Sequence, residues 1–179
     1  RDLALETIGL QRAVAISGGT DAHQNVFPNL ASDGERIDSY RRMMRWFHTR
    51  LQVQAPLSPE SAREALREAR TKVVFEVFGT PQGFDFRAEQ GDTTHEIGAE
   101  IQLADGLPRL KVDLPQLDAR SPRSESVPDV RGLLFRATPA GRELVQDWTE
   151  GSLDVVADVP GVYRVEVWIT PLHLEPYLG

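Results

Sequence analysis

Residues 71–78 read Thr-Lys-Val-Val-Phe-Glu-Val-Phe, and at this stretch the pattern of the sequence changes. From Thr71 onward apolar side chains recur at alternate positions, which is the period of a β-strand. Turns rich in glycine and proline separate these short runs. We expect strands at 73–78, 84–89, 97–103, 110–114, 131–137, 142–147, 153–158 and 162–169. Such a series predicts an antiparallel β-sandwich over residues 71–179.

The residues before Thr71 instead follow the pattern of helices around one short strand. One apolar stripe, spaced by three and four residues, consists of Ile37, Tyr40, Met44, Phe47 and Leu51. With Ser32 and Glu35 as a capping box in front of it, this stripe predicts a helix over residues 33–51. We also expect a helix at 2–8, a strand at 13–16, a loop at 17–31 and a helix that begins at 58–60. Residues 1–70 therefore read as an α/β unit.

The loop after the predicted strand contains Gly18-Gly19-Thr20-Asp21-Ala22-His23. Asp21 and His23 stand at alternate positions, so on extended backbone their side chains point the same way. A carboxylate oxygen and an imidazole nitrogen form a ligand mixture that suits Zn, Mn or Fe. The two glycines let the backbone turn sharply before the pair. The pair predicts one corner of a metal site or, as the alternative, a turn-capping aspartate beside an ordinary polar histidine.

For the other side chains that could take part in chemistry, the sequence favours structural roles. Three further histidines stand in no ligand pattern: His48, His95 and His173. Four arginines predict a basic patch, for which a solvated face is the simplest interpretation: Arg41, Arg42, Arg45 and Arg50. The three tryptophans are expected to be core or interface anchors: Trp46, Trp148 and Trp168. The sequence has neither a glycine-rich phosphate loop nor a Gly-x-Ser-x-Gly nucleophile elbow.

Composition narrows the class of partner. The chain has 179 residues and a formal net charge of −7, with basic residues scattered among acids, which argues against a nucleic-acid or anionic-membrane surface. No apolar run approaches the ~20 residues of a membrane span. Disulfides and thiolate metal sites are excluded because there is no cysteine. Since the chain begins at Arg1 and not at methionine, and enters what reads as a helix within two residues, we expect a fragment or a processed product.

In the order of its segments the chain resembles the C-terminal part of a PHP-type (polymerase and histidinol phosphatase) metallohydrolase, nearest to the CehA/McbA-like branch. The resemblance spans nearly the whole chain and rests on residues 19–23, 33–51, 65–71, 73–78, 78–86 and 160–167. It implies a fold class of α/β plus all-β. Residues 1–70 would be the C-terminal end of a distorted β/α barrel, and residues 71–179 the β-sandwich that follows it.

The same resemblance implies a centre of two or three divalent metal ions at the strand ends of the barrel. In this family a late Asp-x-His box supplies two ligands, which correspond here to Asp21 and His23. The other ligands come from earlier in the barrel, beginning with a His-x-His motif that this sequence does not contain. Clustered divalent ions lower the pKa of a bridging water and polarise a phosphoryl or acyl group.

Two hypotheses about function follow. The first is the C-terminal part of a metal-dependent hydrolase of phosphoesters, or of esters or carbamates, whose remaining ligands lie upstream, so that this chain alone is inactive. The alternative is a non-catalytic β-sandwich module that binds a partner, a glycan or the rest of its own protein. Because the unit is only a fraction of a barrel, Val14, Ile16, Met44 and Phe47 should lack cover. We therefore expect contact with the missing N-terminal barrel portion or a second copy.

Overall fold

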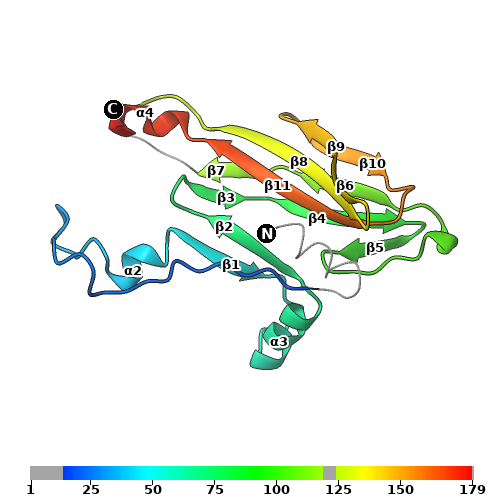
Figure 1. Cartoon of the computed structure of the whole chain (residues 1–179), viewed down its shortest axis with the longest axis horizontal. Helices are drawn as coiled ribbons and strands as arrows, with labels where there is room; N and C mark the ends of the chain where they lie inside the picture. The colour runs from blue at the N-terminus through cyan, green and yellow to red at the C-terminus, as the bar shows by residue number, and fades with distance from the viewer. Residues whose placement is uncertain (1–13, 119–123, 179) are drawn as a thin grey trace.

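The computed structural model describes residues 14–118 and 124–178, and most of its regular elements are β-strands (Figure 1). The helices are α2 (Tyr40–Met43), α3 (Pro59–Arg67) and α4 (Glu175–Leu178), with the 3-10 turns η1 (Leu103–Asp105) and η2 (Leu172–Leu174). The first strands are β1 (Phe47–Leu51), β2 (Thr71–Phe75), β3 (Thr80–Gln82), β4 (Asp85–Gln90) and β5 (Thr93–Glu96). The later ones are β6 (Arg109–Asp113), β7 (Gln116–Asp118), β8 (Asp129–Thr138), β9 (Gly141–Trp148), β10 (Ser152–Val156) and β11 (Val162–Thr170).

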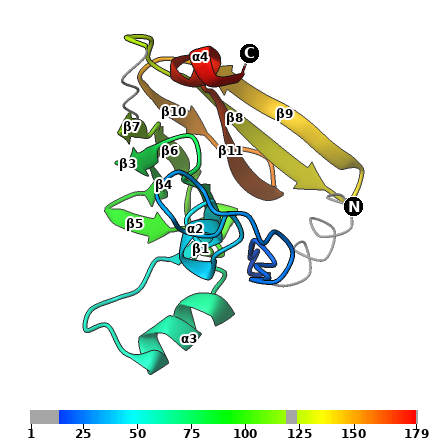
Figure 2. The ribbon, with the colours of Figure 1, turned by 90° about the vertical axis from the view of Figure 1, so that its left-hand side faces the viewer.

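Two antiparallel sheets form the larger part of the molecule, as in a β-sandwich. One has the strand order β10-β6-β4-β5 and the other β11-β8-β9, and Figure 2 shows them as separate layers. The buried cluster between them consists of Ala88, Leu110, Leu134 and Ala157. Since these residues come from both sheets, the sheets share one core. Pairs β1–β2 and β3–β7 complete the strand pairing.

The alternating pattern correctly predicted most of these strands. Those expected at 84–89, 110–114, 131–137, 142–147, 153–158 and 162–169 are β4, β6, β8, β9, β10 and β11. The strand expected at 73–78 is confirmed only in part, since β2 begins two residues earlier and ends at Phe75. Close packing explains a glycine in β8, because a Cβ at Gly132 would lie 2.4 Å from the ring of Trp148.

The strand expected at 97–103 is wrong. Strand β5 ends at Glu96, and Gly98 turns the chain with a φ of +87°. Beyond it, the Gln90 amide donates to the carbonyl oxygens of Gln102 and Gly106, so these two carbonyls bond to a side chain and not to a neighbouring strand. The segment between the strands expected at 73–78 and 84–89 contains the short strand β3, which pairs with β7.

The helix expected at 33–51 is also wrong. Only α2, a single turn capped by Ser39, forms there, and residues 47–51 are strand β1. Pairing with β2 decides this, since all five residues of β1 are in register with β2 and the Phe47 and Phe75 rings stack at 5.0 Å. The helical stripe has no surface to cover it, and Met44 is 62% exposed. Glu35 accepts hydrogen bonds from Ser39 and Arg41 instead of capping a helix.

The strand expected at 13–16 is wrong for residues 14–16, which have no regular secondary structure. Side chains of the β1–β2 pair hold this segment in place of a strand ladder, because the Thr71 hydroxyl donates to the carbonyl of Ile16. The helix expected at 2–8 and Ala13 lie outside the described residues. Most of the loop at 17–31 is confirmed, with one isolated bridge between Leu30 and Arg36.

The helix expected from residue 58 is confirmed as α3. Ser58 accepts a hydrogen bond from the Ser61 N–H, and the Ser61 hydroxyl accepts one from the Ser58 N–H, so the two residues cap the helix reciprocally. Its Ala65 is fully buried. The predicted boundary between two domains at residues 70 and 71 stays a prediction. Strands β1 and β2, which pair with each other, lie on opposite sides of it. No helix of the described residues has the length and apolar character needed to cross a membrane.

Candidate functional site

The Asp-x-His box lies on the loop that runs past the β1–β2 pair, and its two side chains converge. The Oδ1 atom of Asp21 lies 3.3 Å from the Nε2 atom of His23, and these side chains are 94% and 59% exposed. Asp21 has a φ of +49°, the left-handed region, which aspartate tolerates better than most residues. Both donor atoms are therefore close to one another and open to solvent.

Their separation suits ligation of one ion. Donor atoms about 2.0–2.1 Å from a tetrahedral zinc ion are separated by about 3.3–3.4 Å. The separation of 3.3 Å between Asp21 and His23 falls at this value. Among residues 14–118 and 124–178, no group of three or more histidine, aspartate or glutamate side chains is arranged to hold a metal ion. Within the described chain the pair offers two neighbouring donor atoms without a third.

The box begins against the β1–β2 pair. The Gly18 N–H donates to the Thr49 hydroxyl at 2.9 Å, and that hydroxyl donates to the Gly18 carbonyl at 3.1 Å. Glycine is needed here, because a Cβ at Gly18 would lie 2.9 Å from a methyl group of Val73. A Cβ at Gly19 would meet nothing within 4 Å. Of the two glycines in the motif, Gly18 therefore makes the close approach.

The loop that carries the box ends against the carboxylate of Asp38, a buried residue that is 2% exposed. Its Oδ2 atom accepts the N–H groups of Val26 at 2.8 Å and Phe27 at 2.7 Å. Arg36 donates to both carboxylate oxygens at 2.9 Å. The Arg36 guanidinium and the two backbone N–H groups lower the pKa of Asp38 to about 2, so it is ionised at neutral pH.

The remaining histidines lie elsewhere. His48 is on β1, where its Nε2 atom lies 3.3 Å from Arg50 Nε and 3.8 Å from a Glu76 oxygen. His95 lies on β5, an edge strand, where it is half-buried and not exposed as its polar sequence neighbours predict. His173 is 3% exposed near the C-terminus, which confirms the expected packing. Of the tryptophans, Trp148 packs on the core, whereas Trp46 and Trp168 are 42% and 55% exposed.

Acids accompany the predicted basic patch. Arg42 pairs with Asp33 at 2.7 Å, and Arg41 and Arg50 pair with Glu35 and Glu76. Hydrogen bonds from Arg41 and Ser39 lower the pKa of Glu35. Except for Arg50, these charged residues line a hollow of about 290 Å³ together with Arg45, Trp46 and Val77. Sequence reasoning missed it because Glu76, which pairs with Arg50 26 residues earlier, joins it only through the fold. The patch is a compensated ion-pair cluster.

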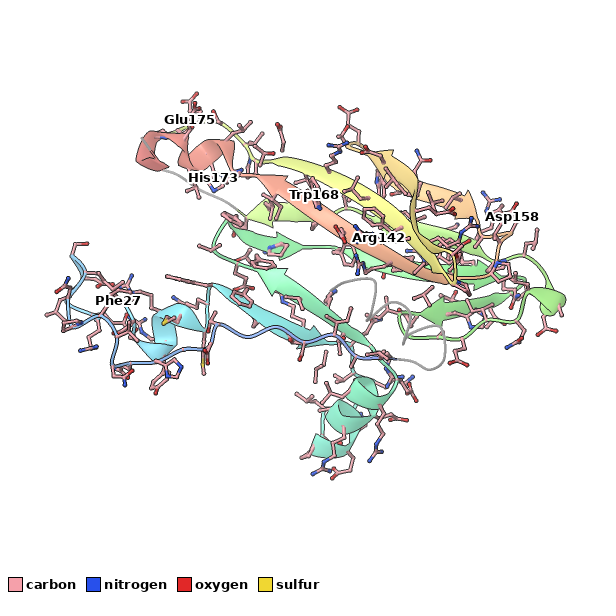
Figure 3. The ribbon with its side chains drawn as sticks, viewed as in Figure 1. Phe27, Arg142, Asp158, Trp168, His173 and Glu175 are labelled. Carbon is pink, nitrogen blue, oxygen red and sulfur yellow. The ribbon has the colours of Figure 1, made fainter. Side chains whose placement is uncertain are left out.

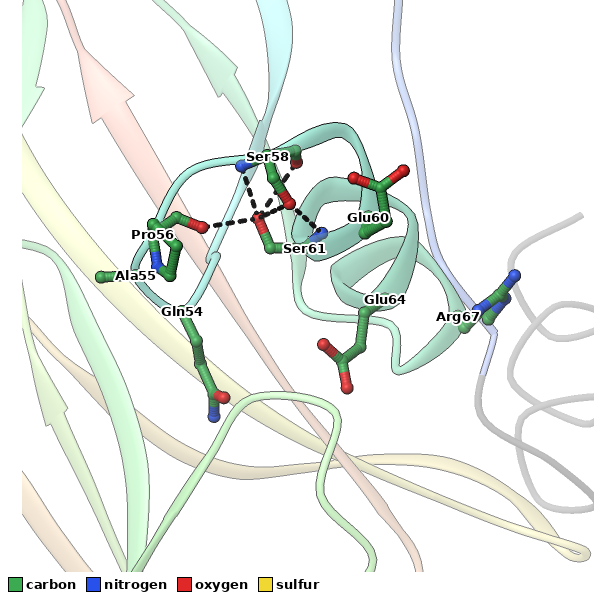
Figure 4. A pocket seen from close by; sticks show the side chains of 8 residues that line it. All are labelled: Gln54, Ala55, Pro56, Ser58, Glu60, Ser61, Glu64 and Arg67. Atoms are coloured by element: carbon green, nitrogen blue, oxygen red, sulfur yellow. Dashed lines mark hydrogen bonds between the residues drawn. The ribbon is translucent and has the colours of Figure 1, made fainter.

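A second hollow, of about 420 Å³, lies at the start of α3 (Figure 4). Its serines are already bonded, since the Ser61 hydroxyl donates to the Pro56 carbonyl at 3.2 Å and accepts the Ser58 N–H. Glu60, Glu64 and Arg67 complete its rim. The two serines serve the helix cap, a role that the Ser-Pro-Glu sequence indicated.

The Asp21–His23 pair is therefore the arrangement with the clearest chemistry in the described chain. Comparison with models of known protein families, with curated proteins and with solved structures finds no match to this chain.

Proposed function

We propose that this chain is the C-terminal part of a metal-dependent hydrolase and that Asp21 and His23 are two ligands of a divalent ion, Zn, Mn or Fe. The observation that supports this best is the 3.3 Å separation of two solvent-open donor atoms, an oxygen and a nitrogen. The resemblance to PHP-type metallohydrolases, which includes the same Asp-x-His box, points to the same function. The remaining ligands of a centre with two or three ions would come from outside the described residues.

The chemistry proposed for the complete centre is attack by metal-activated water on a phosphoester, with an ester as the second substrate class. Bound divalent ions bring the pKa of a water near neutrality and polarise the group under attack. Asp21 would neutralise part of the metal charge, and His23 would fill a position without adding negative charge. Catalytic zinc uses about three protein ligands and an open position, so two donors alone would bind without turnover.

The test compares the chain with the double variant Asp21→Ala and His23→Ala in calorimetric titrations with Zn²⁺ and Mn²⁺. Hydrolysis of a chromogenic phosphomonoester is then measured in the longer protein that carries the upstream segment. We expect the double variant to lose metal binding and hydrolysis together. Unchanged metal affinity and unchanged hydrolysis in that variant would contradict the proposal.

A second candidate function, a non-catalytic binding module, is favoured by the outer face of the β11-β8-β9 sheet. Trp168 and Leu144 are 55% and 51% exposed there, and the Arg142 guanidinium lies 4.4 Å from the centre of the Phe135 ring. Figure 3 shows Trp168 and Arg142 on this sheet, far from Phe27 on the N-terminal loop. Binding to immobilised glycans that Trp168→Ala abolishes and Zn²⁺ leaves unchanged would support this candidate.

A further inference from the structure

We infer that Thr49 and Asp38 are positioning residues for the Asp21–His23 pair, because they clamp the two ends of the loop that carries it. This inference rests on the proposed metal-binding function. Thr49 bonds to Gly18 before the pair, and Asp38 bonds to Val26 and Phe27 after it. Both residues act through the loop, and neither one is proposed as a ligand.

The first clamp is attached to a rigid element. Thr49 is the central residue of β1 and pairs with Val73 of β2. Its β-branched side chain has few rotamers, so the hydroxyl is held in one place. This hydroxyl binds both polar groups of the Gly18 backbone, one as acceptor and one as donor. The close fit of Gly18 against Val73 adds a steric stop on the same side.

The second clamp is the buried, charged side chain of Asp38. Asp38 is 2% exposed and accepts two N–H groups from the loop and two from Arg36. Bonds to an ionised carboxylate are roughly twice as strong as neutral ones. The guanidinium of Arg36 holds the carboxylate plane, so the Val26 and Phe27 N–H groups meet a fixed acceptor. The end of the loop is therefore fixed as firmly as its beginning.

Between the clamps the loop has little other support. Among the hydrogen bonds and ion pairs between described residues, none reaches residues 19–25 except the contact between Asp21 and His23. The geometry of the pair therefore depends on its two anchored ends. Fixing both ends reduces the conformations of the loop before a metal binds, which lowers the entropic cost of ligation.

The experiment is a Zn²⁺ titration of the whole chain, followed by the imidazole nitrogen resonances of His23. His48, His95 and His173 serve as internal references in the same spectra. The variants are Thr49→Val, which keeps the shape without the hydroxyl, Thr49→Ser, which keeps the hydroxyl, and Asp38→Asn. Partners that orient metal ligands typically contribute 10- to 100-fold in affinity, so we expect Thr49→Val and Asp38→Asn each to weaken Zn²⁺ binding about tenfold.

Thr49→Ser should restore the wild-type affinity, a rescue that general destabilisation does not predict. The thermal unfolding of the β-sandwich, recorded for each variant, shows that the protein is folded. If Asp38→Asn fails to fold, the two Thr49 variants decide the outcome. Equal Zn²⁺ affinity in the wild type, Thr49→Val and Thr49→Ser overturns the positioning role but leaves the metal site standing. A wild-type His23 that does not respond to Zn²⁺ overturns the proposed function itself.

Discussion

Residues 14–78 and the β-sandwich, residues 84–118 and 124–178, differ in how well they bury their apolar side chains. In the first region only two apolar residues, Ala65 and Val74, are buried, whereas twelve large hydrophobic side chains are exposed. These are Ile16, Val26, Phe27, Leu30, Ile37, Tyr40, Met44, Trp46, Leu57, Leu66, Phe75 and Val77. In the larger sandwich seven apolar residues are buried and seven large ones are exposed. The sandwich therefore supplies its own core, while the region with the Asp-x-His box has apolar surface available for a partner.

The same two regions also differ in their balance of acidic and basic residues. The described sandwich has seventeen Asp and Glu against seven Lys and Arg, whereas residues 14–78 have eight against nine. A strongly acidic surface repels anionic ligands, and a nearly neutral one does not. A phosphoester substrate is thus better matched to the region that holds Asp21 and His23. Stability and the proposed chemistry are assigned to different parts of the chain.

The largest expected effect is on the core of the sandwich. Leu134 is fully buried, so Leu134→Ala should lower the free energy of unfolding by about 3–4 kcal/mol, through lost transfer energy and the cavity left behind. Leu144→Ala is the matched control, since Leu144 is 51% exposed. Urea unfolding measures both variants. Similar losses in the two would mean that Leu134 does not anchor the core.

A smaller effect is expected where the two regions touch. A Cβ at Gly98 would lie 1.8 Å from the Glu68 carbonyl oxygen, and its φ of +87° disfavours other residues. Gly98→Ala should cost about 2–3 kcal/mol, from backbone strain and displacement of α3. Gly91→Ala isolates the backbone part, because Gly91 has a φ of +58° with open space around it, and should cost about 1 kcal/mol. Equal costs in urea unfolding would argue against the contact.

The pH dependence of the loop follows from Asp38. The pKa of Asp38 is lowered from 3.8 to about 2. Its contribution to the stability of the loop is therefore complete above pH 3.8 and is lost as the pH falls through about 2. The Val26 and Phe27 amides should be protected from hydrogen exchange above that range and lose protection within it. In Asp38→Asn this protection should be weak at every pH. A wild-type loop that keeps its protection below pH 2 would exclude Asp38 as its anchor.

The smallest effect on stability is expected at the box itself. Asp21→Ala and His23→Ala should each change the free energy of unfolding by less than about 0.5 kcal/mol, because both side chains are largely exposed. The same variants should lose Zn²⁺ binding. Thermal unfolding with and without Zn²⁺ measures both effects. A large loss of stability without metal would identify the pair as structural, which is the turn-capping alternative.

The sequence predicted the sandwich better than the region before it. Strand β11 is paired along its whole length with β8, and its apolar residues Tyr163, Val165, Val167 and Ile169 stand at alternate positions, so the period of two is visible in its sequence. Residues 47–51 were misassigned because Phe47 and Leu51 also fit a helical stripe, and only the partner strand β2 decides between the two. The central threonine of that segment was a signal for a strand.

For the candidate site, the sequence predicted that the side chains of Asp21 and His23 converge, but on an extended backbone, whereas Asp21 has a φ of +49°. It could not locate their supports. Thr49 is 31 residues from Gly18, and Asp38 follows Val26 by 12 residues, so both contacts depend on tertiary folding. Asp38 falls within the helix expected at 33–51 but outside its apolar stripe, and that helix does not form. Local patterns indicate which residues can bind, whereas the fold determines what holds them.

The contrast between the two regions is tested most directly by residue-resolved hydrogen exchange of the whole chain with and without Zn²⁺. We predict slow exchange in β6 and β8 that Zn²⁺ does not alter, and faster exchange at residues 18–27 that Zn²⁺ slows. Asp21→Ala with His23→Ala should remove the Zn²⁺ effect and leave the sandwich unchanged. Zn²⁺-independent exchange at residues 18–27, or a Zn²⁺ effect confined to the sandwich, would contradict the account.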